Sequence, residues 1–307
     1  MEQLRILADL AADERQQLFE YIASAGCGEP FHSVDEMIRR YSGPEYDCGR
    51  LHFSLWCSAS AGGRQEVRGC VAAITREAEP KGLLYLIGLQ LAAGDFGMLP
   101  KLLDAALSKV EETPWRKVFL GMPGGRSDLG TAVQQAGFTF VWKGLALERP
   151  VLSSSPETPR LALKTLRFRP VPESAISTLV DVNNAAFRDV ANSATLTIED
   201  GLQWYRGRFG TDLIQLGYED DEPVSLLCLD VQDGIGEVES VGVVPSRQGR
   251  GYGQETLSQA VEIFLARGDV KTVRLTVIDS NERALRLYLK NGFAVVRELS
   301  AWYQRER

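Results

Sequence analysis

The pattern of apolar and polar positions divides the chain into two successive runs of strands and helices. In the first run, strands are expected at 51–59, 67–76, 83–91, 118–121 and 138–147, and helices at 33–41, 98–110 and 128–135. The leading residues Leu4, Leu7 and Leu10 also follow a helical spacing, which continues with Leu18, Tyr21 and Ile22 beyond a cap-like start at Asp13-Glu14. We therefore expect the chain to begin with a helix.

The second run repeats this order of elements. Strands are expected at 166–170, 213–218, 223–231, 236–244, 272–278 and 293–303, and helices at 174–187, 198–209, 253–267 and 281–290. The two runs match best where a helix ends before a glycine and a phenylalanine, at Gly137-Phe138 and Gly292-Phe293. The pattern indicates an internal duplication and a fold of the α+β class.

A segment rich in proline and serine separates the two runs. Residues 150–159 show neither helical nor strand periodicity, which is typical of a linker. The sequence thus predicts one domain over 1–149, a linker over 150–164 and a second domain over 165–307.

The most informative stretch lies in the second run, between Glu237 and Gly253. An apolar strand pattern turns through closely spaced glycines into an amphipathic helix pattern. The first backbone N–H groups of a helix have no partner within the helix, and the helix dipole favours an anion at that end. This stretch therefore predicts a phosphate-binding loop. A dinucleotide-binding loop fits less well, because that fingerprint spaces its glycines differently and opens a βαβ unit.

The spacing of this loop resembles the Gln/Arg-x-x-Gly-x-Gly/Ala signature of the GCN5-related N-acetyltransferase (GNAT) family. The resemblance implies two tandem GNAT folds, each a mostly antiparallel mixed sheet flanked by helices. It is strong over 165–307 and rests on element order alone over 1–150. It also implies that the loop holds the pyrophosphate of acetyl-CoA. The loop residues concerned are Gln248, Gly249, Arg250, Gly251, Tyr252 and Gly253.

Two further parts of the family pattern are present in this sequence. The family pairs the strand before the loop with the pantetheine amides, and Val241 and Val243 stand at the matching positions. The run from Asn281 to Phe293 resembles the family's closing motif, in which the asparagine contacts the cofactor and the tyrosine, here Tyr288, lies near its sulfur. A phenol can protonate a leaving thiolate. Taken alone, Asn281 is equally explained as a helix cap and Tyr288 as a packing residue.

Glu237 is the candidate general base. It falls where histone-modifying members of the family carry a glutamate, and an acceptor amine must lose a proton before it attacks a thioester. Other members use a bound water instead. Glu237 as a solvated strand end is the competing interpretation.

The first run lacks these features. Its corresponding loop, Ala92 to Gly97, has no closely spaced glycines and places Asp95 where a phosphate would approach. In the first run, Val133 stands at the position that corresponds to Tyr288 in the second. Because a carboxylate repels a phosphate, we expect the N-terminal half to leave acetyl-CoA unbound and to serve as a scaffold or a pocket wall.

Composition narrows the function classes. The 307 residues carry a net charge of −7 with a pI near 5.1, which argues against a nucleic-acid partner bound by overall basic charge. Five cysteines without a CxxC pair, early acidic residues and the lack of a long apolar run favour a cytoplasmic protein without a membrane span. His32 and His52 are too few to suggest a metal site. Trp302 and Tyr303 fit either an acceptor pocket or an alternating terminal strand.

These features together predict an N-acetyltransferase that moves an acetyl group from acetyl-CoA to the amine of a small-molecule acceptor. Transfer would occur by direct attack in a ternary complex, without a metal, in a monomer or homodimer. Two alternatives stay open. One is a non-catalytic protein that binds or senses acyl-CoA. The other is a mycothiol-synthase-like acetyltransferase, a tandem branch of the family, for which the sequence offers no acceptor motif.

Overall fold

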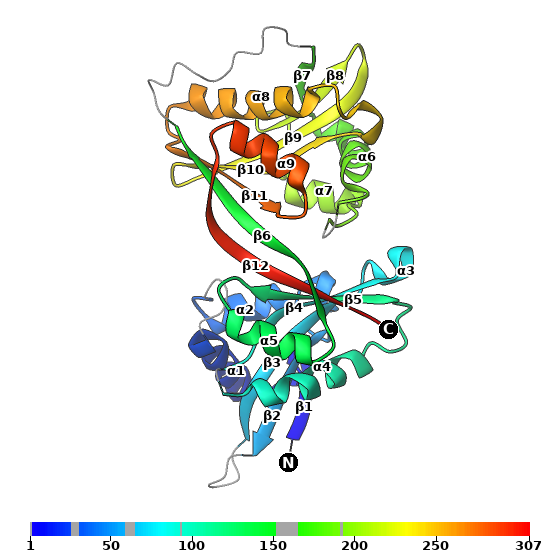
Figure 1. Cartoon of the computed structure of the whole chain (residues 1–307), viewed down its shortest axis with the longest axis vertical. Helices are drawn as coiled ribbons and strands as arrows, with labels where there is room; N and C mark the ends of the chain where they lie inside the picture. The colour runs from blue at the N-terminus through cyan, green and yellow to red at the C-terminus, as the bar shows by residue number, and fades with distance from the viewer. Residues whose placement is uncertain (1, 26–30, 59–64, 93, 152–164, 191–192) are drawn as a thin grey trace. The chain divides into compact units, whose positions relative to one another are not determined.

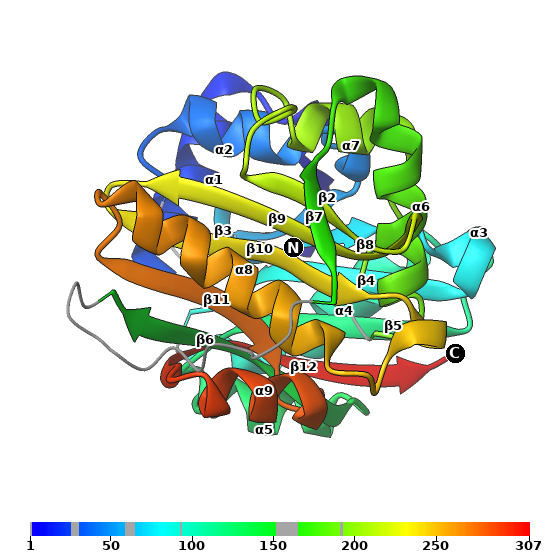
Figure 2. The same ribbon diagram turned by 90° about the horizontal axis from the view of Figure 1, so that it is seen from above.

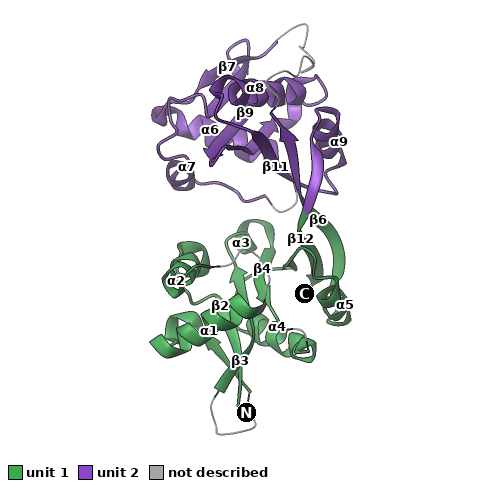
Figure 3. Cartoon of the chain, turned by 90° about the vertical axis from the view of Figure 1, so that its left-hand side faces the viewer, with its two compact units in different colours: residues 1–144, 298–307 green, residues 145–297 purple. Residues whose placement is uncertain are grey.

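The computed structural model describes residues 2–25, 31–58, 65–92, 94–151, 165–190 and 193–307 (Figure 1). The chain forms two compact units, Met1–Gly144 with Glu298–Arg307, and Leu145–Arg297 (Figure 3). Each unit holds its own buried apolar clusters. Most of the predicted linker, residues 152–164, lies outside the described residues.

The first unit is a mixed sheet with helices. Its strand order is β1-β2-β3-β4-β5-β12-β6. Strands β4 and β5 are parallel, whereas β1 with β2, β2 with β3, β3 with β4, and β5 with β12 are antiparallel. The elements that lie wholly in this unit are β1 (Glu2–Ile6), α1 (Ala12–Ala25), α2 (Val34–Tyr41), β2 (His52–Ser58), β3 (Gln65–Ile74), α3 (Ala78–Lys81), β4 (Leu83–Gln90), α4 (Leu99–Ser108), β5 (Lys117–Pro123) and α5 (Ser127–Gln135).

The helix expected at the start of the chain is confirmed for residues 13–22, which lie in α1, and is wrong for the residues before them. Leu4 lies in β1 and pairs with Leu55 of β2. Leu4 and Ile6 both pack against the core of the unit. Pairing at the sheet edge places these alternate residues on the core, which outweighs the helical spacing of the three leucines.

The second unit repeats the arrangement. Its strand order is β6-β11-β10-β9-β8-β7, with β10 and β11 parallel. Its own elements are β7 (Arg167–Pro170), α6 (Ile176–Phe187), α7 (Ile198–Trp204), β8 (Ile214–Glu219), β9 (Glu222–Gln232), β10 (Ile235–Val243), α8 (Tyr252–Arg267), β11 (Thr272–Ile278) and α9 (Glu282–Lys290). Helix α8 lies across the face of β9 and β10 (Figure 2), and α6 packs against the opposite face. The duplication and the predicted α+β fold of two mostly antiparallel mixed sheets are confirmed.

Two long strands contribute residues to both units. Strand β6 (Thr139–Pro150) passes from the first unit to the second at residue 145, and β12 (Ala294–Glu306) returns at residue 298. In the first unit, β12 pairs antiparallel with β5 from Ser300 with Pro123 to Glu306 with Lys117. The units therefore differ from the domain predicted over 165–307, because the last ten residues complete the sheet of the first unit.

A buried histidine makes the stability of the first unit depend on pH. His52 is fully buried, and its ring lies 4.3 Å from that of Tyr41. Burial lowers the pKa of His52 from 6.5 to about 4. Below pH 6.5 this histidine binds a proton in the unfolded chain but stays neutral in the folded chain. The stability that the neutral ring contributes is therefore lost as the pH falls from 6.5 toward 4.

We expect His52→Leu to reduce the dependence of the unfolding free energy on pH between 7 and 4.5 by about 2–3 kcal/mol, measured by urea denaturation. The control is His32→Leu, because His32 is exposed and is the only other histidine. An equal pH dependence in wild type and His52→Leu would contradict this account.

Candidate functional site

The site is built where β10 separates from β11. These parallel strands are paired from Ile235 with Thr272 to Val238 with Leu275. A bulge follows between Val238 and Ser240, where the register with β9 shifts. A bulge places an extra residue on one strand and bends it, so the second half of β10 is free to border a pocket.

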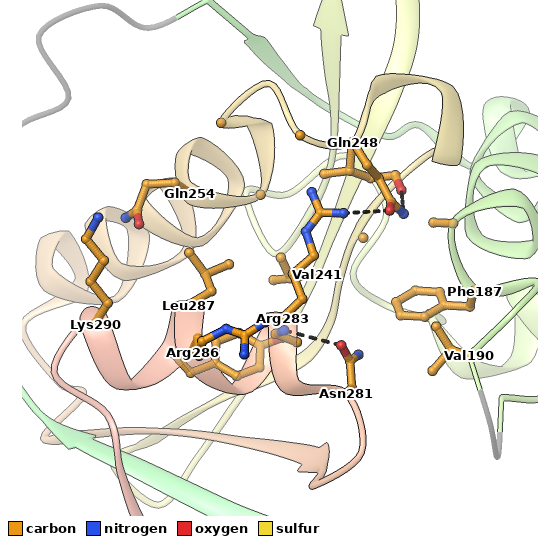
Figure 4. Close-up of a pocket in the computed structure, with 18 residues that line it drawn as sticks. Phe187, Val190, Val241, Gln248, Gln254, Asn281, Arg283, Arg286, Leu287 and Lys290 are labelled. Atoms are coloured by element: carbon orange, nitrogen blue, oxygen red, sulfur yellow. Dashed lines mark hydrogen bonds between the residues drawn. The ribbon is translucent and has the colours of Figure 1, made fainter.

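A pocket of about 480 Å³ lies beside this second half of β10 (Figure 4). It is bordered by the end of α6, by β10, by the loop into α8 and by one face of α9. Its lining includes eight of the predicted site residues: Val241, Val243, Gln248, Gly249, Gly251, Gly253, Asn281 and Tyr288. Glu237, Arg250 and Tyr252 are outside this lining.

The loop between β10 and α8 requires glycine at two positions. Gly249 has φ +83° and Gly251 has φ +87°, which other residues rarely adopt. A Cβ added at either position would meet no atom within 4 Å, so the backbone here borders open space. Gly251 is also the N-cap of α8 and supplies no side chain to its first turn. Gly249, Gly251 and Gly253 all line the pocket, so the start of α8, where a helix favours an anion, borders it.

Gln248 ties this loop to its neighbours. Its side-chain amide donates a hydrogen bond of 3.0 Å to the carbonyl oxygen of Val243 at the end of β10. Its amide oxygen accepts a bond of 2.9 Å from Arg283 of α9, visible in Figure 4. The side chain therefore links the strand, the loop and the helix that border the pocket.

Arg250 and Tyr252 face the turn between β8 and β9. Glu219 accepts a hydrogen bond from the Tyr252 hydroxyl and pairs with Arg250 at 3.5 Å. Arg247 pairs with the same carboxylate at 2.8 Å and with Glu222. The hydrogen bond from Tyr252, followed by these arginines, lowers the pKa of Glu219. Acidic residues of the turn thus hold the loop from outside, and the cofactor contacts predicted for Arg250 and Tyr252 stay a prediction.

The two polar residues of the closing motif lie on α9. Asn281 caps the helix, and its side-chain oxygen accepts a hydrogen bond of 3.2 Å from the Ala284 N–H. Tyr288 lies two turns further and is 9% exposed. Burial raises the pKa of Tyr288 to about 12. The phenol is therefore protonated at neutral pH and available as a donor at the wall of the pocket.

Glu237 lies before the bulge, half-buried on β10. Its pKa is raised, mainly by burial and also by the carboxylates of Glu239, Asp230 and Glu148, while Arg274 opposes the shift. Val241 lies four positions further along the strand, a distance of about 13 Å at the rise per residue of a strand. Glu237 thus combines the raised pKa of a candidate base with a position that needs a water to reach the pocket.

Comparison with known proteins identifies the domain that carries this pocket. The model of the acetyltransferase (GNAT) family matches residues 177–293, which contain every residue that lines the pocket. This part of the chain is a GNAT domain. The match includes the glycine loop and ends at the phenylalanine of the closing motif.

Two proteins similar to this chain in sequence are both mycothiol acetyltransferases by name. A mycothiol acetyltransferase from Kineococcus radiotolerans is 32% identical over 198 residues, which cover 62% of this chain and 63% of the relative. A mycothiol acetyltransferase from Beutenbergia cavernae is 33% identical over 139 residues, covering 44% of this chain and 40% of the relative. The chain thus spans less than two thirds of the length of these relatives.

Solved structures extend the GNAT likeness to the whole chain. A GCN5-related N-acetyltransferase from Sphaerobacter thermophilus has a TM-score of 0.70 at 20% identity and covers 99% of this chain and 95% of its own. A tandem GNAT protein from the clavulanic acid biosynthesis pathway has a TM-score of 0.60 at 11% identity, with coverage of 100% and 98%. At this identity the likeness concerns the fold, and it confirms the tandem GNAT architecture.

Several residues that line this pocket were not among those predicted from the sequence. Helix α9 contributes Arg283, Arg286 and Lys290, and Phe187 at the end of α6 and Val190 just after it also line the pocket (Figure 4). The cations stand three and four positions apart, which is the spacing of one helical face. That spacing, applied to the predicted helix 281–290, was the signal available in the sequence.

The corresponding place in the first unit is built differently. A 3-10 turn (Phe96–Met98) runs directly into α4, whose second residue is Pro100 and has no N–H. The N–H of Met98 is already bonded to the carbonyl oxygen of Asp95. Arg126 lies before α5, where Asn281 lies before α9, and donates a 3.1 Å bond to the carbonyl oxygen of Leu91. These contacts support the proposal that the first unit leaves acetyl-CoA unbound.

In the residues that the structure describes, no group of three or more His, Cys, Asp or Glu side chains is placed to hold a metal ion. No helix within the described ranges is long and apolar enough to cross a membrane. Trp302 and Tyr303 lie on β12 beside β5, in the first unit, and are not part of the described pocket lining. Of the two interpretations of these aromatic residues, the alternating terminal strand is the one that the structure supports.

Proposed function

We propose that this protein transfers an acetyl group from acetyl-CoA to the amine of a small-molecule acceptor, by direct attack in a ternary complex. The observation that carries the proposal is that one pocket of a GNAT domain is lined both by the glycine loop at the start of α8 and by a buried, protonated tyrosine, Tyr288. Relatives named mycothiol acetyltransferases favour an acceptor related to mycothiol.

The residues of the pocket fit acetyl-CoA. The N–H groups between Gly249 and Gly253 would hold the pyrophosphate at the start of α8, where the helix dipole favours negative charge. Val241 and Val243 border the pocket beyond Val238, the last residue of β10 that pairs with β11, so their backbone can pair with the pantetheine amides as a neighbouring strand would. Asn281, the N-cap of α9, also lines the pocket.

The chemistry needs two proton transfers. When the amine nitrogen forms its bond to the thioester carbon, the C–S bond breaks and the leaving thiolate takes a proton. Tyr288 holds that proton, because burial keeps its hydroxyl neutral. The proton lost by the amine passes through water to Glu237, whose raised pKa brings its carboxylate nearer to the value that suits a general base. A backbone N–H near Val243 would stabilise the oxyanion.

We expect Tyr288→Phe to lower kcat by about ten- to a hundredfold and to change the KM for acetyl-CoA less than threefold, since the hydroxyl acts mainly in the transition state. The measurement is acetyl transfer to a panel of small amines that includes deacetylated mycothiol. Tyr303→Phe is the control, because this buried tyrosine lies in the first unit.

Two outcomes would change the assignment. Tight binding of acetyl-CoA without turnover on any amine would replace the enzyme by an acyl-CoA-binding or sensing protein. If Glu237→Gln leaves the rate and its rise with pH unchanged, then water alone accepts the amine proton and Glu237 is a structural residue.

A further inference from the structure

Helix α9 concentrates positive charge on the pocket. From Glu282 to Lys290 it carries three cations and one carboxylate, a net charge of +2, in a chain whose net charge is −7. All three cations line the pocket. Such a local concentration of positive charge favours an anionic ligand.

The cations are not equivalent. The Arg283 guanidinium extends to Gln248 and is bonded to it, at the glycine loop. Arg286 and Lys290 follow by one and two turns, so Lys290 lies about 10 Å along the helix axis from Arg283. Lys290 and Gln254 lie at the same end of the pocket in Figure 4. The positive face of α9 thus extends well beyond the anion site of the loop.

Arg286 and Lys290 are available to a ligand. Both residues are exposed, and Arg286 is 71% exposed at its side chain. Arg286 pairs with Glu282 four positions earlier at 2.8 Å, and an exposed pair of this kind contributes only a few tenths of a kcal/mol. An incoming phosphate can therefore displace Glu282 at little cost.

A CoA thioester carries one phosphate group more than the loop accounts for. Its pyrophosphate matches the N–H groups at the start of α8, and the remaining phosphate is on the 3′ position of the ribose. We propose that Arg286 and Lys290 bind this 3′-phosphate, so that the pocket selects a 3′-phosphorylated cofactor over its dephosphorylated form. The proposal rests on the proposed function only in that the ligand is a CoA thioester.

The test compares the affinities of CoA and 3′-dephospho-CoA by titration calorimetry. We expect wild type to bind CoA about tenfold more tightly, as one or two charge-assisted hydrogen bonds allow. In Arg286→Gln with Lys290→Gln, this ratio should fall below about threefold while the affinity for 3′-dephospho-CoA stays unchanged. Lys271→Gln, an exposed cation of the same unit outside the pocket lining, should keep the tenfold ratio.

Two results would overturn the inference: equal binding of both ligands by wild type, or an equal loss of both affinities in the double variant. The proposed function fails in a different way. CoA binding with a preserved tenfold ratio but without turnover on any amine removes the enzyme and leaves the 3′-phosphate site standing. A failure to bind CoA at all overturns both.

Discussion

Replacing Gly251 with valine is expected to lower the affinity for acetyl-CoA by about a hundredfold or more. At φ +87° a β-branched residue costs on the order of 1–2 kcal/mol, and the backbone would relieve this strain by rotating the peptide groups that form the anion site. The N–H groups that we propose to bind the pyrophosphate would then be displaced together, because they depend on one backbone conformation. Calorimetric titration of acetyl-CoA into the purified variant measures the effect.

Gly268 provides a matched control at the other end of the same helix. It has φ +72°, and a Cβ added there would also meet no atom within 4 Å. Gly268→Val should therefore lower the unfolding free energy by about the same amount as Gly251→Val and leave acetyl-CoA affinity unchanged. Equal affinities in the two variants would show that the loop does not hold the cofactor.

Trp302→Ala is expected to destabilise the first unit by about 3–5 kcal/mol, the usual cost of removing a buried aromatic residue. The indole is 9% exposed, packs against Tyr85 and Trp142, and lies over Gly121, where an added Cβ would come within 2.9 Å of the ring. The loss should appear as faster hydrogen exchange at the amides of β5. The amides of β9, in the second unit, should keep their protection.

Val296→Ala is the control on the same strand. Val296 is 51% exposed and belongs to the second unit, so its truncation should change stability by less than about 0.5 kcal/mol. If Trp302→Ala instead exposed β9 and left β5 protected, the last residues of the chain would support the second unit, contrary to the pairing of β12 with β5.

Much of this architecture could be predicted from the sequence because its signals are local. Glycines at Gly249 and Gly251 mark a backbone conformation that few other residues adopt, and the helical and strand periods that follow reflect which side chains reach a core. The repeated order of elements was enough to indicate two copies of one fold. The same local rules failed at Leu4, where a strand partner more than fifty residues away decides the structure.

The rest depends on contacts that are distant in sequence. Strand β10 separates from β11 because of a bulge near Ser240, and no residue type in the sequence indicates that bulge. The engagement of Arg250 and Tyr252 with Glu219 joins the loop to a turn about thirty residues earlier. The hydrophobic periodicity of a strand does not show which of two units the strand belongs to. The pairing of residues 298–307 with the first unit could therefore not be predicted from the sequence.

The return of β12 to the first unit has a consequence for synthesis. During translation, the first unit leaves the ribosome with one side of β5 unpaired, because the strand that covers it, β12, follows only after the whole second unit. The unpaired edge of β5, which includes Phe119 and Leu120, is a site to which another chain can add a strand. The edge of β5 therefore stays open until β12 has been made, so the first unit completes its sheet only after the residues of the second unit have emerged.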